Sequence, residues 1–240
     1  MKKVKLVALD MDNTVVLSEE KAFEACTVVV NETLAAKGVD FAFTPAQLME
    51  RFVGKVFWRI ISELALEHEF RLEPAELDTL TLKEQNAVIA RLRAEVEPCE
   101  GVDEVLRVLY QKYILAVVSS SAMPRLMACL EKTGHGAFIP DTHVFSAATS
   151  LPVPTTKPEP LIYQHAMETL GVTADETVAV EDSKNGVLSA VRAGIWCVGY
   201  VGAYPEHERA ELTKTLLEAG ASIVITHWNE FEKALASREC

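Results

Sequence analysis

Apolar and polar positions follow two different periods along this chain, and a short apolar run opens it. Residues 4–9 are apolar apart from Lys5, and the run stops abruptly at Asp10. A run of this length and composition is typical of a strand buried inside a parallel sheet. We therefore expect the first strand at residues 4–9.

Residues 16–95 follow a helical period instead. Thr44–Gln47 has the pattern of an N-cap, a first-turn proline and a capping-box glutamine, and a long helix is expected to begin near Pro74. We expect no strand between Val15 and Ala94. The apolar stripes that predict these helices are Phe23, Val30 and Leu34; Val56, Ile60 and Leu64; and Leu77, Leu80, Val88 and Leu92.

Strands and helices alternate from Pro98 onward, which is the pattern of a parallel sheet built from βαβ units. The sequence thus predicts an α/β fold, with residues 1–15 and 96–240 as its core and residues 16–95 as an all-helical insertion. The expected strands are Ile114–Val118, His143–Ser146, Thr177–Val180, Ile195–Val198 and Ile223–Ile225, and the expected helices are Val102–Leu109, Pro124–Leu130, Pro160–Leu170, Gly186–Ala193 and Arg209–Ala219.

Composition narrows the class of partner. The chain has 240 residues, 49% of them hydrophobic, and a net charge of -12 without a cluster of Lys or Arg, which argues against binding to a nucleic acid backbone. No apolar segment is long enough for a membrane span or a signal peptide. The five cysteines are scattered and form no C-x-x-C pair, as in a reduced, cytoplasmic protein. The oligomeric state cannot be inferred from the sequence.

Two carboxylates stand at the exit of the first expected strand. Asp10 and Asp12 repel each other unless a cation lies beside them, and a divalent metal with oxygen ligands is the usual partner. A calcium loop does not fit, because Val15 and Lys21 occupy the positions of its glycine and its bidentate glutamate. A polar turn after an edge strand would explain the pair equally well if it stood alone.

Polar residues also follow the later strands. Because the carboxyl ends of parallel strands meet at one edge of a sheet, these residues should lie near Asp10. Hydroxyl and ammonium groups bind phosphate oxygens, and carboxylates bind cations, so together they predict a site for a metal and a phosphate. The residues concerned are Ser119, Ser120, Ser121, Lys157, Glu181 and Asp182.

The order of these motifs resembles the haloacid dehalogenase superfamily, in its branch of β-phosphoglucomutase-like and phosphoglycolate phosphatase-like enzymes. The resemblance covers nearly the whole chain and implies a Rossmann-like core with a helical cap at residues 16–95. One position departs from the usual pattern, since Asn13 stands where glycine is most frequent. The motifs are Asp10-Met11-Asp12-Asn13-Thr14, Ser119 after an apolar run, Lys157-Pro158-Glu159-Pro160, and Glu181-Asp182-Ser183-Lys184-Asn185-Gly186.

The resemblance implies a role for each residue. Asp10 would be the nucleophile that forms an aspartyl-phosphate, and Asp12 the general acid and base, which gives its backbone carbonyl to Mg²⁺. Asp10 and Asp182 would bind the same ion, with Glu181 orienting metal-bound water. The expected contacts to the phosphoryl group come from Thr14, Ser119, Ser120 and Lys157.

The function expected from the resemblance is a Mg²⁺-dependent phosphatase that acts on a small phosphorylated metabolite, a sugar or organic-acid phosphate. The alternatives are a sugar phosphomutase and a non-catalytic phosphate-sensing protein. Sugar mutases of this branch carry a histidine shortly after the first motif, and Glu19–Phe23 contains none. Dehalogenases of the family lack the second acid, whereas Asp12 is present here.

Substrate choice is expected to depend on the helical insertion. Arg51, Lys55, Trp58 and Arg59 surround Gly54, and cationic and aromatic side chains beside a turn are suited to bind a leaving group. An ordinary helix start with a solvated arginine explains the same pattern equally well.

Overall fold

The computed structural model describes residues 2–238, and the chain separates into two compact units. The first takes the start of the chain up to Leu17 and everything from Glu97 onward, and the second is Ser18–Val96. We call them the α/β unit and the helical unit. No helix among the described residues is both long and apolar enough to cross a membrane.

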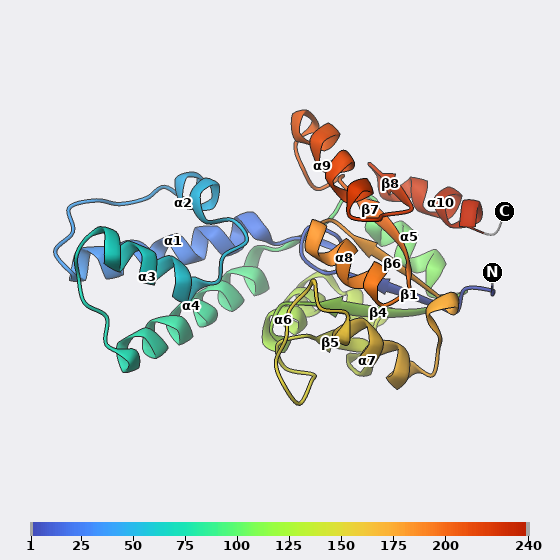
Figure 1. Ribbon diagram of the computed structural model, residues 1–240, viewed down its shortest axis with the longest axis horizontal. Coiled ribbons are helices and arrows are strands. Elements are labelled where there is room, and N and C mark those ends of the chain that lie inside the picture. Colours follow the sequence, from blue (N-terminus) through green and yellow to red (C-terminus); the bar gives the residue numbers. More distant parts are fainter. Residues whose placement is uncertain (1, 239–240) are drawn as a thin grey trace. The chain divides into compact units, whose positions relative to one another are not determined.

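A six-stranded parallel sheet forms the centre of the α/β unit, in the order β5-β4-β1-β6-β7-β8 (Figure 1). The first strand in the chain, β1, lies in the middle, and all four of its residues are buried. This confirms the predicted α/β fold. The strands are β1 (Leu6–Leu9), β4 (Ile114–Ser119), β5 (Val144–Ser146), β6 (Thr177–Glu181), β7 (Trp196–Tyr200) and β8 (Ile223–Ile225).

The register of the central strands brings their carboxyl ends together. Leu9, the last residue of β1, pairs with Val117 of β4 and with Val180 of β6. The residues that follow these three positions leave the sheet at one edge, where loops from several strands converge.

In the part of the α/β unit that the structure describes, six helices flank the sheet. One face is covered by α7, α8 and α9, whose apolar side chains form one buried cluster with alternate residues of the strands, such as Ala8, Ala116 and Cys197. The helix α10 is not among those expected from the sequence. The six are α5 (Val102–Leu109), α6 (Met123–Thr133), α7 (Leu161–Leu170), α8 (Lys184–Arg192), α9 (Glu206–Glu218) and α10 (Phe231–Arg238).

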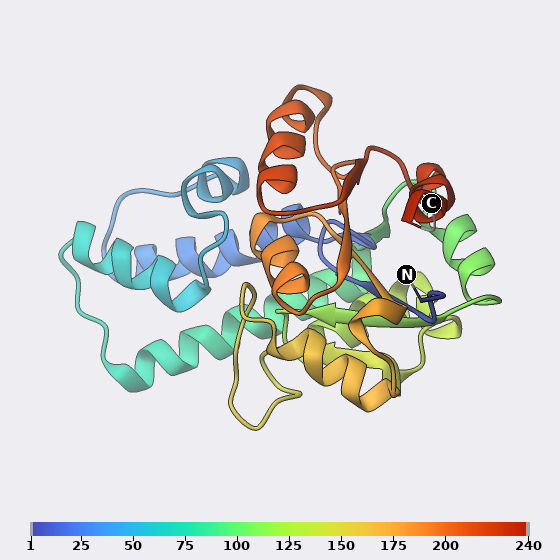
Figure 2. The same cartoon turned by 45° about the vertical axis from the view of Figure 1, so that its right-hand side comes forward.

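Four helices build the helical unit, where α1 and α4 run side by side (Figure 2). Thr44 and Gln47 form the predicted capping box at the start of α2. The stripe on the third helix is partly wrong, since Val56 precedes the helix and is exposed, while Ile60 and Leu64 are buried. The helices are α1 (Glu19–Ala36), α2 (Pro45–Phe52), α3 (Phe57–Glu67) and α4 (Pro74–Glu95).

The expectation of no strand between Val15 and Ala94 is wrong. A two-residue strand, β2 (Val16–Leu17), pairs antiparallel with β3 (Glu97–Pro98). A strand of two residues is too short to show an alternating pattern, so its signal lies only in its partner far along the chain. Within residues 2–238, four short 3₁₀ segments complete the secondary structure, at His135–Ala137, Asp141–His143, Ala174–Glu176 and Trp228–Glu230.

Candidate active site

The turn after β1 holds the first two acidic residues. Asp10 is buried, and its backbone N–H donates to the Val180 carbonyl at 3.0 Å, which continues the pairing with β6. The Met11 carbonyl accepts from the backbone N–H groups of residues 14–16. Asn13 lies within this turn and has φ 53°. Asparagine tolerates this left-handed conformation better than most residues, which explains why the turn forms without glycine.

Lys157 is buried at the centre of the site. Its Nζ atom donates to Asp10 Oδ1 at 2.5 Å, to Glu181 Oε1 at 2.6 Å and to the Val118 carbonyl at 2.7 Å. Burial opposes the charge of the ammonium group, but the Asp10 and Glu181 carboxylates outweigh burial and raise the pKa of Lys157. Lys157 is therefore a cation that links the ends of β1, β4 and β6.

Three carboxylates gather around this cation. Asp10, Glu181 and Asp182 each place one oxygen within 4.8 Å of the oxygens of the others, and all three side chains are buried. When all three are deprotonated, their three negative charges against the single charge of Lys157 leave two, which a divalent cation would neutralise. An all-oxygen set of this kind fits Mg²⁺. The donor set therefore fits the expected metal.

The pKa values of all three carboxylates are raised, first by burial and then by the neighbouring negative charges. Burial raises the pKa of Asp10, against the opposing effect of Lys157. Burial also raises the pKa of Glu181 to about 7, and that of Asp182 well above its ordinary value. A bound cation would favour the charged forms and lower all three pKa values again.

Glu181 is the most enclosed of the three. The hydroxyl of Tyr163, on α7, donates to its Oε1 atom, and no described residue bonds its Oε2 atom. A Cβ atom at Gly186 would lie 1.7 Å from that Oε2, so only glycine fits at this point of α8. The glycine of the fourth motif thus makes room for the Glu181 carboxylate. The contact from Tyr163 was not identified from the sequence.

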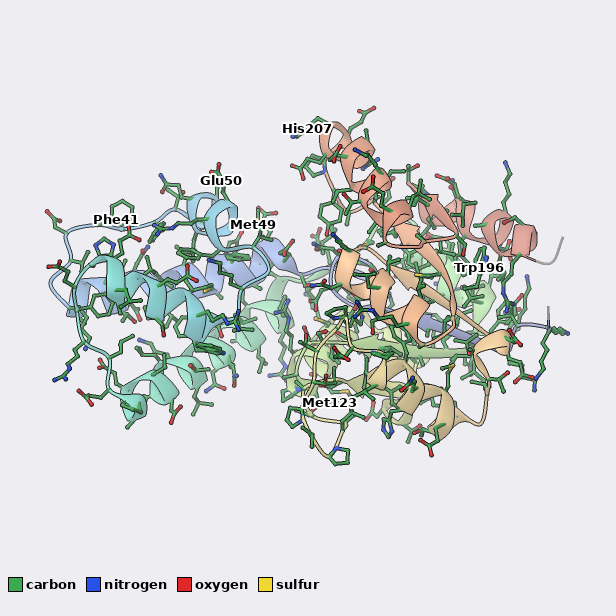
Figure 3. The ribbon with its side chains drawn as sticks, in the orientation of Figure 1. Phe41, Met49, Glu50, Met123, Trp196 and His207 are labelled. Atoms are coloured by element: carbon green, nitrogen blue, oxygen red, sulfur yellow. The ribbon has the colours of Figure 1, made fainter. Side chains whose placement is uncertain are left out.

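Asp12 is not a member of the cluster of three carboxylates, and each of its carboxylate oxygens accepts a hydrogen bond. Ser121 Oγ donates to Asp12 Oδ2 at 2.6 Å, and Arg125 Nη2, near the start of α6, donates to Oδ1 at 2.7 Å. Figure 3 labels Met123, the first residue of that helix. The contact of Arg125 with Asp12 was not predicted from the sequence. The available signal was its position, about one helical turn after the serines at 119–121.

The other expected phosphate ligands have mixed surroundings. Ser119 is buried, and its Oγ accepts from the Ser121 backbone N–H at 3.1 Å. Ser120 Oγ accepts from the Lys157 backbone N–H at 3.1 Å, so it supports the loop that carries the lysine. Thr14 is fully buried with no partner for its Oγ1 among the described residues. Its carbonyl accepts from Trp228 Nε1 at 3.1 Å.

Comparisons with known proteins agree with this geometry. Protein CbbY of Cereibacter sphaeroides is 29% identical over 226 residues, which are 92% of this chain and 94% of that protein. The 6-phosphogluconate phosphatase of Escherichia coli K12 is 26% identical over 198 residues, 81% of each chain. A haloacid dehalogenase family hydrolase from Deinococcus radiodurans R1, solved with bound phosphate and sodium, is 26% identical in sequence. Its structure matches with a TM-score of 0.73 and covers 98% of this chain and 96% of that one.

The family model for haloacid dehalogenase-like hydrolases matches residues 4–194. That range includes all four motifs and the whole helical unit. The chain therefore belongs to the haloacid dehalogenase-like hydrolase family.

Proposed function

We propose that this protein is a Mg²⁺-dependent phosphatase that hydrolyses a small phosphorylated metabolite through an aspartyl-phosphate on Asp10. The observation that carries the proposal is the position of Asp10, whose carboxylate lies beside one buried cation, Lys157, and two further carboxylates, Glu181 and Asp182. Phosphoryl transfer needs positioning and charge neutralisation more than elaborate bond-making, and this cluster provides both.

The first step transfers the phosphoryl group to the protein. A carboxylate oxygen of Asp10 attacks phosphorus and forms an O–P bond, while the bond from phosphorus to the leaving oxygen breaks. Asp12 gives a proton to that oxygen, so the product leaves as an alcohol. Lys157 donates to an oxygen of the transferred group, and Ser119 Oγ, at the end of β4, donates to another.

The second step returns Asp10 to its free form. Asp12, now a carboxylate, takes a proton from water, whose oxygen attacks phosphorus as the bond to Asp10 breaks. Inorganic phosphate leaves, and Asp12 carries the proton for the next cycle. Mg²⁺ held by Asp10 and Asp182, with Glu181 beside it and the Asp12 carbonyl as a further ligand, would offset the negative charge of the carboxylates and the phosphate.

The helical unit is proposed as a cap that limits access of bulk water during turnover. Of its four singled-out side chains, Arg51 pairs with Glu67, and Lys55 pairs with Glu63 at 2.7 Å. Arg59 instead lies 5.1 Å from the centroid of the exposed Trp58 ring. Arg59 and Trp58 are therefore our first choices for residues that select the substrate.

The proposal is tested by measuring release of inorganic phosphate across a panel of metabolite phosphates. Because a relative is a 6-phosphogluconate phosphatase, the panel should include sugar phosphates and phosphorylated sugar acids. We expect activity with Mg²⁺ on at least one small ester, and loss of that activity with a chelator. Phosphate release that is unaffected by chelation, or its absence across the panel, would contradict the proposal.

A further inference from the structure

The loop between β7 and α9 brings a tyrosine to the metal site. The hydroxyl of Tyr204 donates to Asp182 Oδ2, although the loop belongs to none of the four motifs. Figure 3 labels His207, near the start of the following helix. Asp182 is buried within a carboxylate cluster, so a neutral donor to one of its oxygens offsets part of the cost of burying the carboxylate without adding charge.

The structure of the loop fixes Tyr204 in place. Arg209, on α9, donates to the Tyr204 carbonyl at 2.7 Å through Nε and to the Gly202 carbonyl at 3.0 Å through Nη2. The Val201 N–H donates to the Ile225 carbonyl, at the end of β8. One arginine thus holds the backbone of the loop at two carbonyls, one of which belongs to Tyr204 itself.

Gly202 allows the loop to pack closely. A Cβ atom there would lie 2.4 Å from the Thr226 carbonyl oxygen and 2.6 Å from the Tyr200 ring, both closer than real Cβ contacts. Because the clash would be with backbone, a larger residue would displace the loop. Three features therefore hold Tyr204 against Asp182: the close packing of Gly202, the contacts of Arg209 and the hydrogen bond from the tyrosine hydroxyl.

Asn13 extends the support to the nucleophile turn. Its Nδ2 atom lies 3.5 Å from the Tyr204 hydroxyl, a long contact at the limit of a hydrogen bond. The side chain that replaces the more frequent glycine therefore points to the tyrosine that bonds Asp182. Asn13 lies between Asp12 and Thr14, so the contact connects the first motif to the fourth.

We propose that Tyr204 is a positioning residue for the metal ligand Asp182, with Asn13 as a weaker second contributor. The hydroxyl holds one carboxylate oxygen and fixes the side-chain rotamer, which leaves the second oxygen to bind a cation. This inference deepens the proposed function and rests on it for the identity of the site. Loss of such an outer partner commonly weakens metal binding by about 10- to 100-fold.

The test measures metal binding directly. The Tyr204→Phe variant removes only the hydroxyl, and Tyr110→Phe, at an exposed tyrosine of the α/β unit, is the matched control. Mn²⁺ binding to metal-free protein, followed by electron paramagnetic resonance, should weaken about 10-fold or more in Tyr204→Phe and remain unchanged in the control. Saturating Mg²⁺ should restore most of the kcat of Tyr204→Phe, which it would not do for a merely damaged fold.

A second variant keeps the inference testable. Asn13→Gly relieves the positive φ, so it should fold at least as well as the wild type, yet bind Mn²⁺ a few-fold more weakly. In the double variant the loss should be smaller than the product of the single losses, because both act through Asp182. Additive losses would remove Asn13 from the proposal.

The outcomes separate this inference from the proposed function. If wild type hydrolyses esters and Tyr204→Phe binds Mn²⁺ as tightly as wild type, the positioning role fails and the function stands. If wild type hydrolyses nothing while Tyr204→Phe loses Mn²⁺ affinity, the role stands and the function fails. If wild type binds no divalent cation, both fail.

Discussion

Lys157 Nζ and Asp10 Oδ1 lie 2.5 Å apart, although the two residues are separated by 147 positions in the sequence. The ammonium group therefore serves two needs. It neutralises part of the buried carboxylate charge in the free protein, and in the proposed reaction it donates to an oxygen of the phosphoryl group.

Asp10→Asn is expected to abolish turnover and leave the fold intact. The substitution keeps the size of the side chain but removes the nucleophile and one metal ligand, so kcat should fall about 10³-fold or more. Phosphate release and thermal melting report the two properties separately. Wild-type rates in the purified variant would exclude Asp10 as the nucleophile.

Asp182→Ala and Lys157→Ala are expected to fail in different ways. Asp182→Ala should mainly weaken metal binding, so added Mg²⁺ recovers activity. Lys157→Ala should mainly weaken phosphate binding and lower kcat by about 10²-fold or more, as for other lost donors to a developing charge. A Mg²⁺ titration of each variant distinguishes them, and equal recovery of both would refute this division.

Arg125→Met is expected to slow turnover by roughly 10- to 100-fold without weakening Mg²⁺ binding, because Asp12 loses the donor on Oδ1 and with it a fixed position. Its effect on the free energy of unfolding should stay below about 1 kcal/mol, since the ion pair is partly exposed. The loss should be smaller for an aryl phosphate than for an alkyl phosphate in single-turnover measurements, because a good leaving group needs little protonation. Arg125→Lys should recover part of the rate. A loss independent of the leaving group would contradict this role.

The stability of the metal-free protein should fall as pH rises through the range from about 5 to 7. Burial raises the pKa of Glu181 from its ordinary value of 4.5 to about 7, and raises those of Asp10 and Asp182 in the same direction. The folded state then holds protons that the unfolded chain has released, and this favours folding only at the lower pH.

Thermal melting with a chelator, at several pH values, measures this slope. Mg²⁺ should raise the melting temperature more at pH 8 than at pH 6, because the ligands bind the ion when deprotonated. Glu181→Gln should flatten the slope of the metal-free protein. A melting temperature that rises with pH in chelator would show that the cluster is not protonated in the folded state.

The phosphoryl group is expected to end on water and not on a second hydroxyl of a sugar. Glucose 1-phosphate, supplied with and without a bisphosphate activator, distinguishes the two reactions. Formation of glucose 6-phosphate faster than inorganic phosphate would favour a mutase. Phosphate release from other esters without an isomer would favour the phosphatase.

Several of the residues that the sequence identified stand directly after a buried apolar run, whereas Lys157 lies in a loop eleven residues after the end of β5. Asp10, Ser119 and Glu181 could be placed at one edge because the alternation of strands and helices predicts a parallel sheet. That alternation predicts the α/β fold class, whereas the order β5-β4-β1-β6-β7-β8 was not predicted, because several strand orders fit the same alternation.

The supporting residues could not be found in the same way. Tyr163, Arg125 and Tyr204 lie on helices or in a loop, and their contacts depend on which side chains face the sheet edge after packing. An isolated Tyr or Arg has no pattern that separates such a role from an ordinary surface or core position. Short β2 was missed for a related reason, because its identity depends on a partner that follows the whole helical unit.

The pairing of β2 with β3 has a consequence for how this chain can be altered. Leu17 and Glu97 are opposite each other in an antiparallel ladder, so the chain leaves the α/β unit and returns to it at neighbouring points. A two-residue Asn-Gly turn is of the right kind to join such ends directly. The intervening residues therefore form a module that protein engineering could shorten, replace or exchange with that of a relative. The two parts of the α/β unit would remain covalently joined through the β2–β3 pair.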